Sequence, residues 1–194
     1  METQKLSVKK RVEEGSSSSR RLRNSGILPG TLYGSENEAI TVEMELNAVK
    51  SVLHNHSSET ILMEIDLEGE GSLSVLMKEI QHHPVTNALL HVDLQRVIAG
   101  KPIQVDIALE LKGEPEGVKV GGLLDHVLHS ISIQCLPKDL IEVVELDISE
   151  LNIGDSVYVS DLKLPSKLTI LTDNESMIAA VNAPRVEEEV SDES

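Results

Sequence analysis

Alternation of apolar and polar residues runs through most of the chain and predicts a mainly β protein. Residues 39–46 ("AITVEMEL") and 89–97 ("LLHVDLQRV") change type at almost every position, the period of a strand with one face in a core. Residues 60–69 and 71–81 flank a glycine-containing turn and predict a hairpin. Two further extended segments are expected at residues 4–14 and 27–34.

Two segments of the first half have helical character instead. In residues 47–56, Val49, Val52 and Leu53 follow helical spacing, and Asn47 is a suitable N-cap. Residues 16–26 ("SSSSRRLRNSG") predict a short helix with a serine cap and Gly26 as its C-terminal stop.

The pattern of strand and turn signals changes near Arg96–Gly100, which predicts a domain boundary. A new series of strand and turn signals begins at residue 103, and its segments end in Gly, Pro, Asn or Asp. One short turn of helix is expected within residues 147–155. The predicted division is a first domain at 1–96, a β-rich second domain at 97–184, and a disordered acidic tail at 185–194 ("RVEEEVSDES").

The amino-acid composition indicates which side chains form the core and in which cellular compartment the protein is expected. Hydrophobic residues make up 40% of the 194 residues, with no Phe, no Trp and two Tyr, so the core must be aliphatic. The single cysteine excludes an intramolecular disulfide, which fits a reducing compartment. Neither a secretory signal nor a membrane-spanning apolar run is visible, and we expect a soluble cytoplasmic protein.

Charge is distributed unevenly along the chain. The formal net charge is −16, yet residues 1–30 hold seven Lys or Arg against three Glu, a balance of +4. The overall acidity argues against non-specific coating of nucleic acid but leaves room for one local basic site. Arg20 and Arg23 share one helix face beside the serines. Charge alone favours a solvated basic face over a phosphate-binding one.

Catalytic and metal-binding patterns are weak. The seven histidines show no spacing that would gather the three or four ligands of a zinc site, and Cys135 lies in an alternating strand where a buried thiol is expected. GxSxG, P-loop and GxGxxG motifs are absent. We therefore expect no enzyme, no cofactor and no small-molecule substrate. The two tyrosines also make a base-stacking RNA platform improbable.

Several spaced motifs resemble a known family. "RLRNSGILPGTLYG", "EIQHHPV" and "HVDLQRV" are similar to signatures of the bacterial ribosomal protein family that binds 5S rRNA, the twenty-fifth of the large subunit. "GEPEGVKVGGLL" and residues 135–165 resemble the C-terminal domain of its longer form, which is also described as a general stress protein. The resemblance covers nearly the whole chain except the acidic tail.

The resemblance implies an N-terminal six-stranded β-barrel with short helices, a separate mostly β C-terminal domain, and no catalysis. The implied partner is the loop E region of 5S rRNA, an irregular double helix. Arginines would meet the RNA backbone and grooves, the serine lies in the approaching loop, and the remaining residues match the "YG", glutamine-before-"HP" and "HxD" motifs. Carried over by motif, the candidate RNA-binding residues are Arg11, Ser19, Arg20, Arg23, Tyr33, Lys78, Gln81, His91 and Asp93.

Some positions depart from the family pattern. Ser16–Ser18 stand where many members carry Lys or Gly, and His82 stands where Arg is common. Both changes remove positive charge, so we expect weaker binding. Leu94 replaces the usual Phe, which changes packing. Because the Asp93 carboxylate repels phosphate, our hypothesis is that it accepts a hydrogen bond from a base, or orients His91 or an arginine.

The sequence therefore predicts a cytoplasmic, ribosome-associated protein that docks on 5S rRNA through its first domain. Residues 97–194 hold seven Lys or Arg against nineteen Asp or Glu, a charge of −12. Such a domain should face solvent or a basic ribosomal protein neighbour. The alternative is a free general stress protein whose acidic C-terminal domain binds a basic protein partner.

Overall fold

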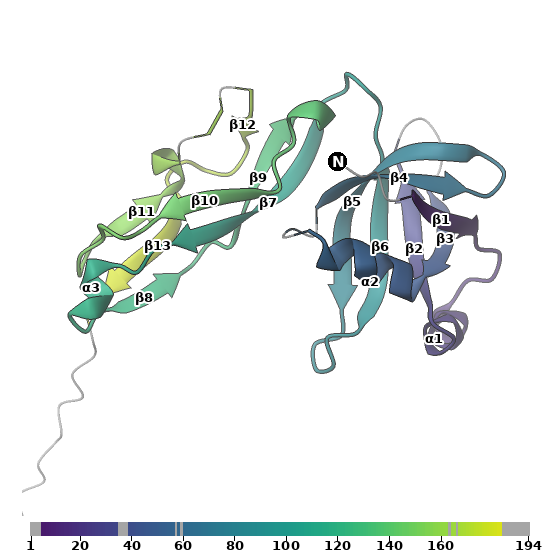
Figure 1. The fold of residues 1–194 in the computed structure, drawn as a ribbon, viewed down its shortest axis with the longest axis horizontal. Helices are drawn as coiled ribbons and strands as arrows, with labels where there is room; N and C mark the ends of the chain where they lie inside the picture. Colours follow the sequence, from purple (N-terminus) through teal and green to yellow (C-terminus); the bar gives the residue numbers. More distant parts are fainter. Residues whose placement is uncertain are drawn as a thin grey trace, which may run out of the picture.

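The computed structural model describes residues 5–34, 39–56, 58, 60–162, 164–165 and 167–183. It is mainly β and has two parts, each with its own hydrophobic core (Figure 1). The first part contains β1 (Lys5–Lys10), α1 (Ser16–Asn24), β2 (Ile27–Tyr33), β3 (Ile40–Glu45), α2 (Leu46–His54), β4 (Ile61–Leu67), β5 (Gly71–His82) and β6 (Leu89–Arg96).

The six strands of the first part form a closed barrel in the order β1-β3-β2-β6-β5-β4. Four strand contacts are antiparallel, whereas β1 with β4 and β2 with β6 are parallel. The mainly β class, the six-stranded barrel and its short helices are thus confirmed. Closure leaves no open sheet edge in this part of the fold.

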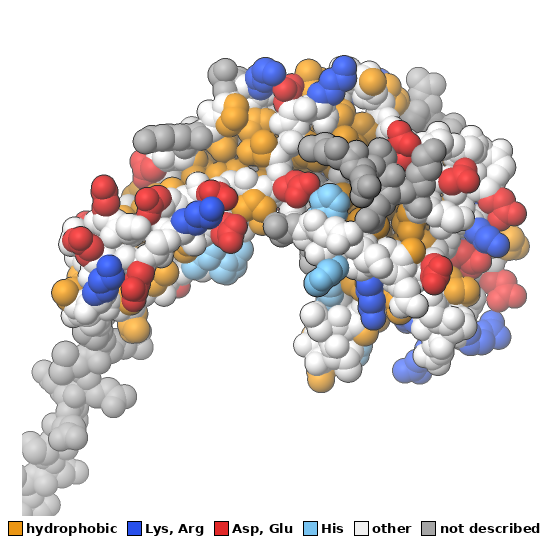
Figure 2. Space-filling model, viewed as in Figure 1, with side chains coloured by type: hydrophobic (Ala, Val, Ile, Leu, Met, Phe, Trp, Pro, Cys, Tyr) orange, Lys and Arg blue, Asp and Glu red, His pale blue; other side chains and the backbone are white. Residues whose placement is uncertain are grey.

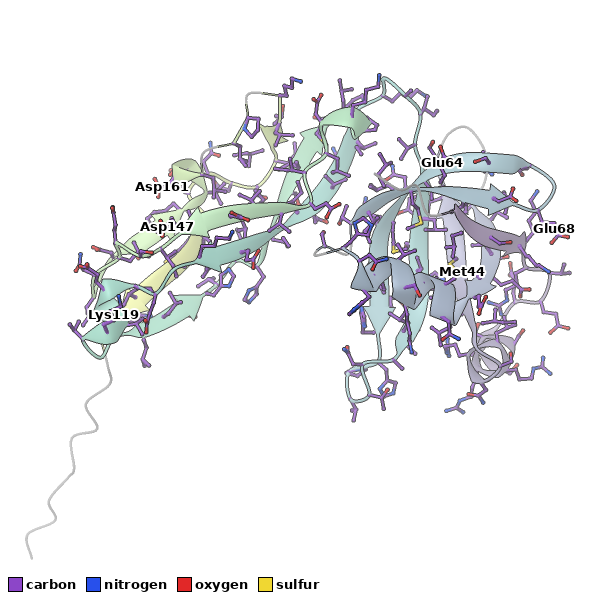
Figure 3. The ribbon with its side chains drawn as sticks, in the orientation of Figure 1. Met44, Glu64, Glu68, Lys119, Asp147 and Asp161 are labelled. Atoms are coloured by element: carbon purple, nitrogen blue, oxygen red, sulfur yellow. The ribbon has the colours of Figure 1, made fainter. Side chains whose placement is uncertain are left out.

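Aliphatic side chains fill the barrel, as the lack of Phe and Trp requires. Alternate residues of the strands point inward, and Val8, Leu28, Ile65 and Val92 are fully buried. Figure 3 shows Met44 inside the barrel, while the carboxylate of Glu68 points to solvent. Helix α2 packs its buried Val49 and Val52 against the same cluster, in accordance with their helical spacing.

The helix ends differ in part from the prediction. Gly26 follows α1 with a φ of 81° and ends the helix as expected. The predicted caps are wrong: Gly15 is the N-cap of α1, and α2 starts at Leu46 with Glu45 as its N-cap. Neither N-cap residue makes a side-chain capping bond.

The second part consists of two sheets around an aliphatic core. One sheet has the order β10-β7-β9-β12 and the other β11-β13-β8. Ile107, Ile131, Ile133 and Ile178 are almost completely buried in this core. Its elements are β7 (Ile103–Lys112), α3 (Glu116–Lys119), β8 (Leu123–His126), β9 (Ser130–Cys135), β10 (Val143–Asp147), β11 (Ser156–Tyr158), β12 (Thr169–Ile170) and β13 (Met177–Asn182), with 3-10 turns at Pro137–Asp139 and Val159–Asp161.

Two predictions for the second part have different outcomes. The helical turn expected within residues 147–155 is wrong, because hydrogen-bonded turns at Ile148–Leu151 and Asn152–Asp155 replace it. Cys135 is buried on β9, as its alternating strand indicated, and burial raises the pKa of its thiol. The predicted acidic tail at 185–194 lies outside the described residues.

Two polar contacts and one buried leucine connect the two parts. Oγ1 of Thr60 donates to the carbonyl of Asp106 at 2.9 Å, and Nδ1 of His56 lies 3.0 Å from a carboxylate oxygen of Glu142. Leu76 of β5 is fully buried in the core of the second part. These contacts join the barrel to the domain that follows it. Within the described ranges, no helix has the length and apolar character needed to cross a membrane.

Candidate RNA interface

A polar face lies on the outside of three neighbouring barrel strands, β2, β6 and β5. Strand register pairs Thr31 with Asp93 across β2 and β6. It also pairs Gln81 with His91, and Glu79 with Asp93, across β5 and β6. Because side chains alternate along each strand, these residues and Tyr33 project from the same side, away from the aliphatic core.

His91 is held at both of its ring nitrogens. Nδ1 lies 2.9 Å from a carboxylate oxygen of Asp93, and Nε2 lies 3.3 Å from the hydroxyl of Thr31. With the proton on Nδ1, the ring donates to Asp93 and accepts from Thr31. The contact agrees with an orienting role for Asp93. Both side chains remain more than a quarter exposed, so their edges are accessible.

Tyr33 adds a phenol hydroxyl to this face. Partial burial raises the pKa of the phenol, and the negative charges of Asp93 and Glu79 raise it further. The phenol therefore stays neutral throughout the physiological range and can donate a hydrogen bond.

Titration of Tyr33 provides a test of this arrangement. In a Tyr158→Phe background Tyr33 is the only tyrosine, and its phenolate absorbance should develop with a midpoint above the ordinary value of 10.0. Asp93→Asn and Glu79→Gln should each lower the midpoint, because each removes a negative charge. Since the folded pKa exceeds the unfolded one, stability from this group is present below pH 10.0 and is lost at higher pH.

The matched control is Glu145→Gln, which removes a carboxylate that pairs with Lys112 in the second part. This variant should leave the Tyr33 titration unchanged. If Asp93→Asn also left it unchanged, Asp93 would not face the phenol.

Helix α1 brings the arginines to one side of the same strands. Nη1 of Arg23 donates to the carbonyl of Leu90 at 3.2 Å, which ties the helix to the start of β6. Arg20 is exposed. Arg21 instead pairs with Glu13 at 3.3 Å. Figure 2 shows lysine and arginine side chains over this part of the barrel, whereas acidic side chains dominate the second part.

Arg11 and Ser19 meet at the start of α1. Nη2 of Arg11 donates to the hydroxyl of Ser19 at 3.1 Å, and that hydroxyl donates to the carbonyl of Gly15 at 2.9 Å. The guanidinium is therefore positioned from β1 against the first turn of the helix. Its Nε atom is buried, so an anion outside the protein would contact the outer N–H groups of the guanidinium.

The structure thus brings most of the sequence-predicted site residues into two adjoining groups. Tyr33, Gln81, His91 and Asp93 share the strand face, and Arg11, Ser19, Arg20 and Arg23 lie on or against α1. Lys78 differs, because it is the extra residue of a bulge between Met77 and Glu79 and stands outside the pairing.

Sequence reasoning missed Thr31 and Glu79. Thr31 contacts His91, and Glu79 faces Asp93 across the two strands. Each lies two residues before a predicted site residue, Tyr33 or Gln81, so the two-residue period of a strand could have identified both.

Comparisons with known proteins agree with this picture. The family model described as the Ribosomal L25p family matches residues 6–94, and the one for the C-terminal domain of ribosomal protein TL5 matches residues 102–185. A relative from Carboxydothermus hydrogenoformans, named large ribosomal subunit protein bL25, is 40% identical over 188 residues, covering 96% of this chain and 93% of its own.

The chain belongs to the bacterial bL25 family of large-subunit ribosomal proteins. Relatives of the same name from Akkermansia muciniphila and Sorangium cellulosum are 39% and 34% identical. They cover 89% and 95% of this chain, and 85% and 80% of their own length.

Membership of this family confirms the resemblance in both halves of the chain. These relatives are named as large-subunit ribosomal proteins, so the alternative of a free stress protein gains no support. In the described part of the chain, no three His, Cys, Asp or Glu side chains gather in a way that could hold a metal ion.

Proposed function

We propose that this protein is a non-catalytic, structural component of the large ribosomal subunit that binds the loop E region of 5S rRNA. It is accordingly cytoplasmic and ribosome-associated. The observation that carries the proposal is the polar face of Tyr33, Gln81, His91 and Asp93 beside the arginines of α1. The bL25 names of its relatives support the ribosomal part of the proposal.

The chemistry of this surface suits an irregular RNA helix. Arg20 and Arg23 contact phosphates, which position the protein without reading sequence. Gln81 donates to and accepts from base edges, while Asp93 and Thr31 fix the orientation of the exposed His91 ring beside it. In a regular A-form helix the base edges lie in a narrow major groove that side chains cannot enter. A distorted internal loop is therefore the better binding site for this surface.

Function is divided between the two domains. Residues 1–96 bind RNA, and residues 97–184 form a second domain that projects away from it, followed by the tail at 185–194. The net charge of −12 in residues 97–194 repels the phosphate backbone. The link through Thr60 and Asp106 fixes where this acidic domain starts relative to the barrel.

A gel-shift experiment with two RNAs tests the proposal. The full chain should bind intact 5S rRNA and bind at least about tenfold more weakly to a variant whose loop E is replaced by regular Watson–Crick pairs. Chemical footprinting of the complex should protect loop E.

A variant of the exposed face provides the control. Gln81→Ala should weaken binding to intact 5S rRNA and have little effect on the regularised RNA, because the second RNA offers no base edge to read. Equal affinity of the wild-type chain for both RNAs, or protection elsewhere on 5S rRNA, would contradict the assignment to loop E.

A further inference from the structure

Exposed apolar side chains gather at one end of the second domain. Val120 is 73% exposed, Leu123 60% and Val127 51%, while Leu124 and Ile153 are each 39% exposed. We call these five residues the β8 surface, because they lie in β8, beside it, or in the loop packed against it. Figure 2 shows apolar side chains next to acidic ones at this end of the domain.

Close backbone packing joins the parts of the β8 surface. A Cβ atom on Gly122 would lie 3.0 Å from Cγ1 of Ile153 and 2.7 Å from the carbonyl of Gly117. The loop that carries Ile153 therefore lies directly against the residues that lead into β8. Apolar surface of this kind on a folded domain marks an interaction site more often than an isolated exposed side chain does.

Strand β8 also has a free edge. It is the last strand of the sheet β11-β13-β8, and among the described strands it pairs with β13 alone, with Leu124 opposite Val181 and His126 opposite Ala179. About half of the backbone N–H and C=O groups of an edge strand point away from its partner. An extended segment can therefore pair with β8 as a fourth strand.

The negative charge of the second domain determines which kind of segment would pair with β8. The second half of the chain carries −12, and Asp125 lies within β8 itself. Figure 3 shows further acidic side chains, such as Asp147 and Asp161, on the outside of this domain. A second copy of the chain would bring like charges together at the shared edge, and RNA would be repelled. A lysine- or arginine-rich protein segment is attracted.

We propose that the β8 surface docks an extended, basic segment of another protein. The segment adds to the free edge of β8, and its alternating side chains pack on Leu123 on one face of the sheet and on Leu124 on the other, while its cations face the acidic domain. This interaction is separate from the RNA face and does not depend on it.

Nuclear magnetic resonance with a model peptide tests the docking. The probe is a short peptide of alternating lysine and valine, added to the isotope-labelled full chain. Shifts should concentrate in residues 120–127 and at Ile153, and the β8 amides should exchange more slowly with solvent. The same peptide with glutamate in place of lysine should not bind.

Two leucine variants separate docking from general charge attraction. Leu123→Lys should weaken peptide binding about tenfold and leave 5S rRNA binding unchanged. Leu171→Lys is the matched control, because Leu171 is 45% exposed in the same domain but outside the β8 surface. Circular dichroism would verify that both variants are folded.

Three results would overturn the proposal. One is an equal loss of peptide binding in Leu123→Lys and Leu171→Lys, which would indicate attraction to the whole acidic domain. Another is a set of shifts spread evenly over that domain. The third is dimerisation of the chain in sedimentation experiments that Leu123→Lys abolishes, because the occupant of β8 would then be a second copy.

Discussion

Raising the monovalent salt concentration from about 50 to about 200 mM is expected to weaken 5S rRNA binding about 100-fold. About four phosphate contacts give a slope near −3 to −4 when the logarithm of the binding constant is plotted against that of salt. Arg11, Arg20 and Arg23 supply three of the cations. A filter-binding series over this salt range measures the slope.

Variants of single arginines measure how much each residue contributes to this slope. Arg20→Ala should reduce it by about one and weaken binding to all RNA sequences alike. Arg21→Ala removes the same charge from the next position of α1, on a different face, where the guanidinium pairs with Glu13. It should leave the slope nearly unchanged. If the two variants behaved alike, the arginines would form only a solvated basic face.

Gly30→Ala is expected to destabilise the barrel strongly. A Cβ atom at residue 30 would lie 2.7 Å from the backbone carbonyl oxygen of Val92, in the β2–β6 ladder. Because that oxygen belongs to the backbone, no side-chain rotation relieves the clash. The free energy of unfolding should fall by about 3 kcal/mol, a large part of the stability of a small domain. Thermal unfolding followed by circular dichroism measures the loss.

Two other glycines provide the controls for this prediction. Gly117→Ala, whose Cβ would lie 2.7 Å from the amide nitrogen of Ile153, should destabilise the second domain and preserve 5S rRNA binding. Gly100→Ala meets no atom within 4 Å and costs only the strain of its positive φ, about 1 kcal/mol. Loss of rRNA binding in Gly117→Ala, or a barrel unaffected by Gly30→Ala, would contradict the assignment.

The first residues of the two helices show that N-cap preference alone did not predict where a helix begins. Asn47 and the serines are good N-caps by type, yet α2 starts two residues earlier than an Asn47 cap requires, and α1 starts one residue earlier than a Ser16 cap requires. The N–H of Leu46 donates to the carbonyl of Gly26 at 2.9 Å, so a tertiary contact replaces the side-chain cap of α2. At α1, the positive φ of Gly15 suits glycine and brings its carbonyl to the hydroxyl of Ser19.

The bulge in β5 shows that strand alternation alone could not place every residue of the candidate RNA interface. Alternation placed His91 and Asp93 on one face, and the structure agrees. Lys78 could not be placed in this way, because an extra residue in one strand interrupts the period of two without any clear mark in the sequence.

By itself, the sequence determined the strands, the aliphatic core, the buried thiol and the uneven charge, because these follow from residue type and local period. Its motifs indicated the family, and through it the barrel. Only the tertiary structure decided which strands are neighbours, and therefore that Thr31 holds His91 and Glu79 faces Asp93. The same holds for the free edge of β8. Strand pairing joins residues far apart in the chain, and a period of two carries no information about the partner.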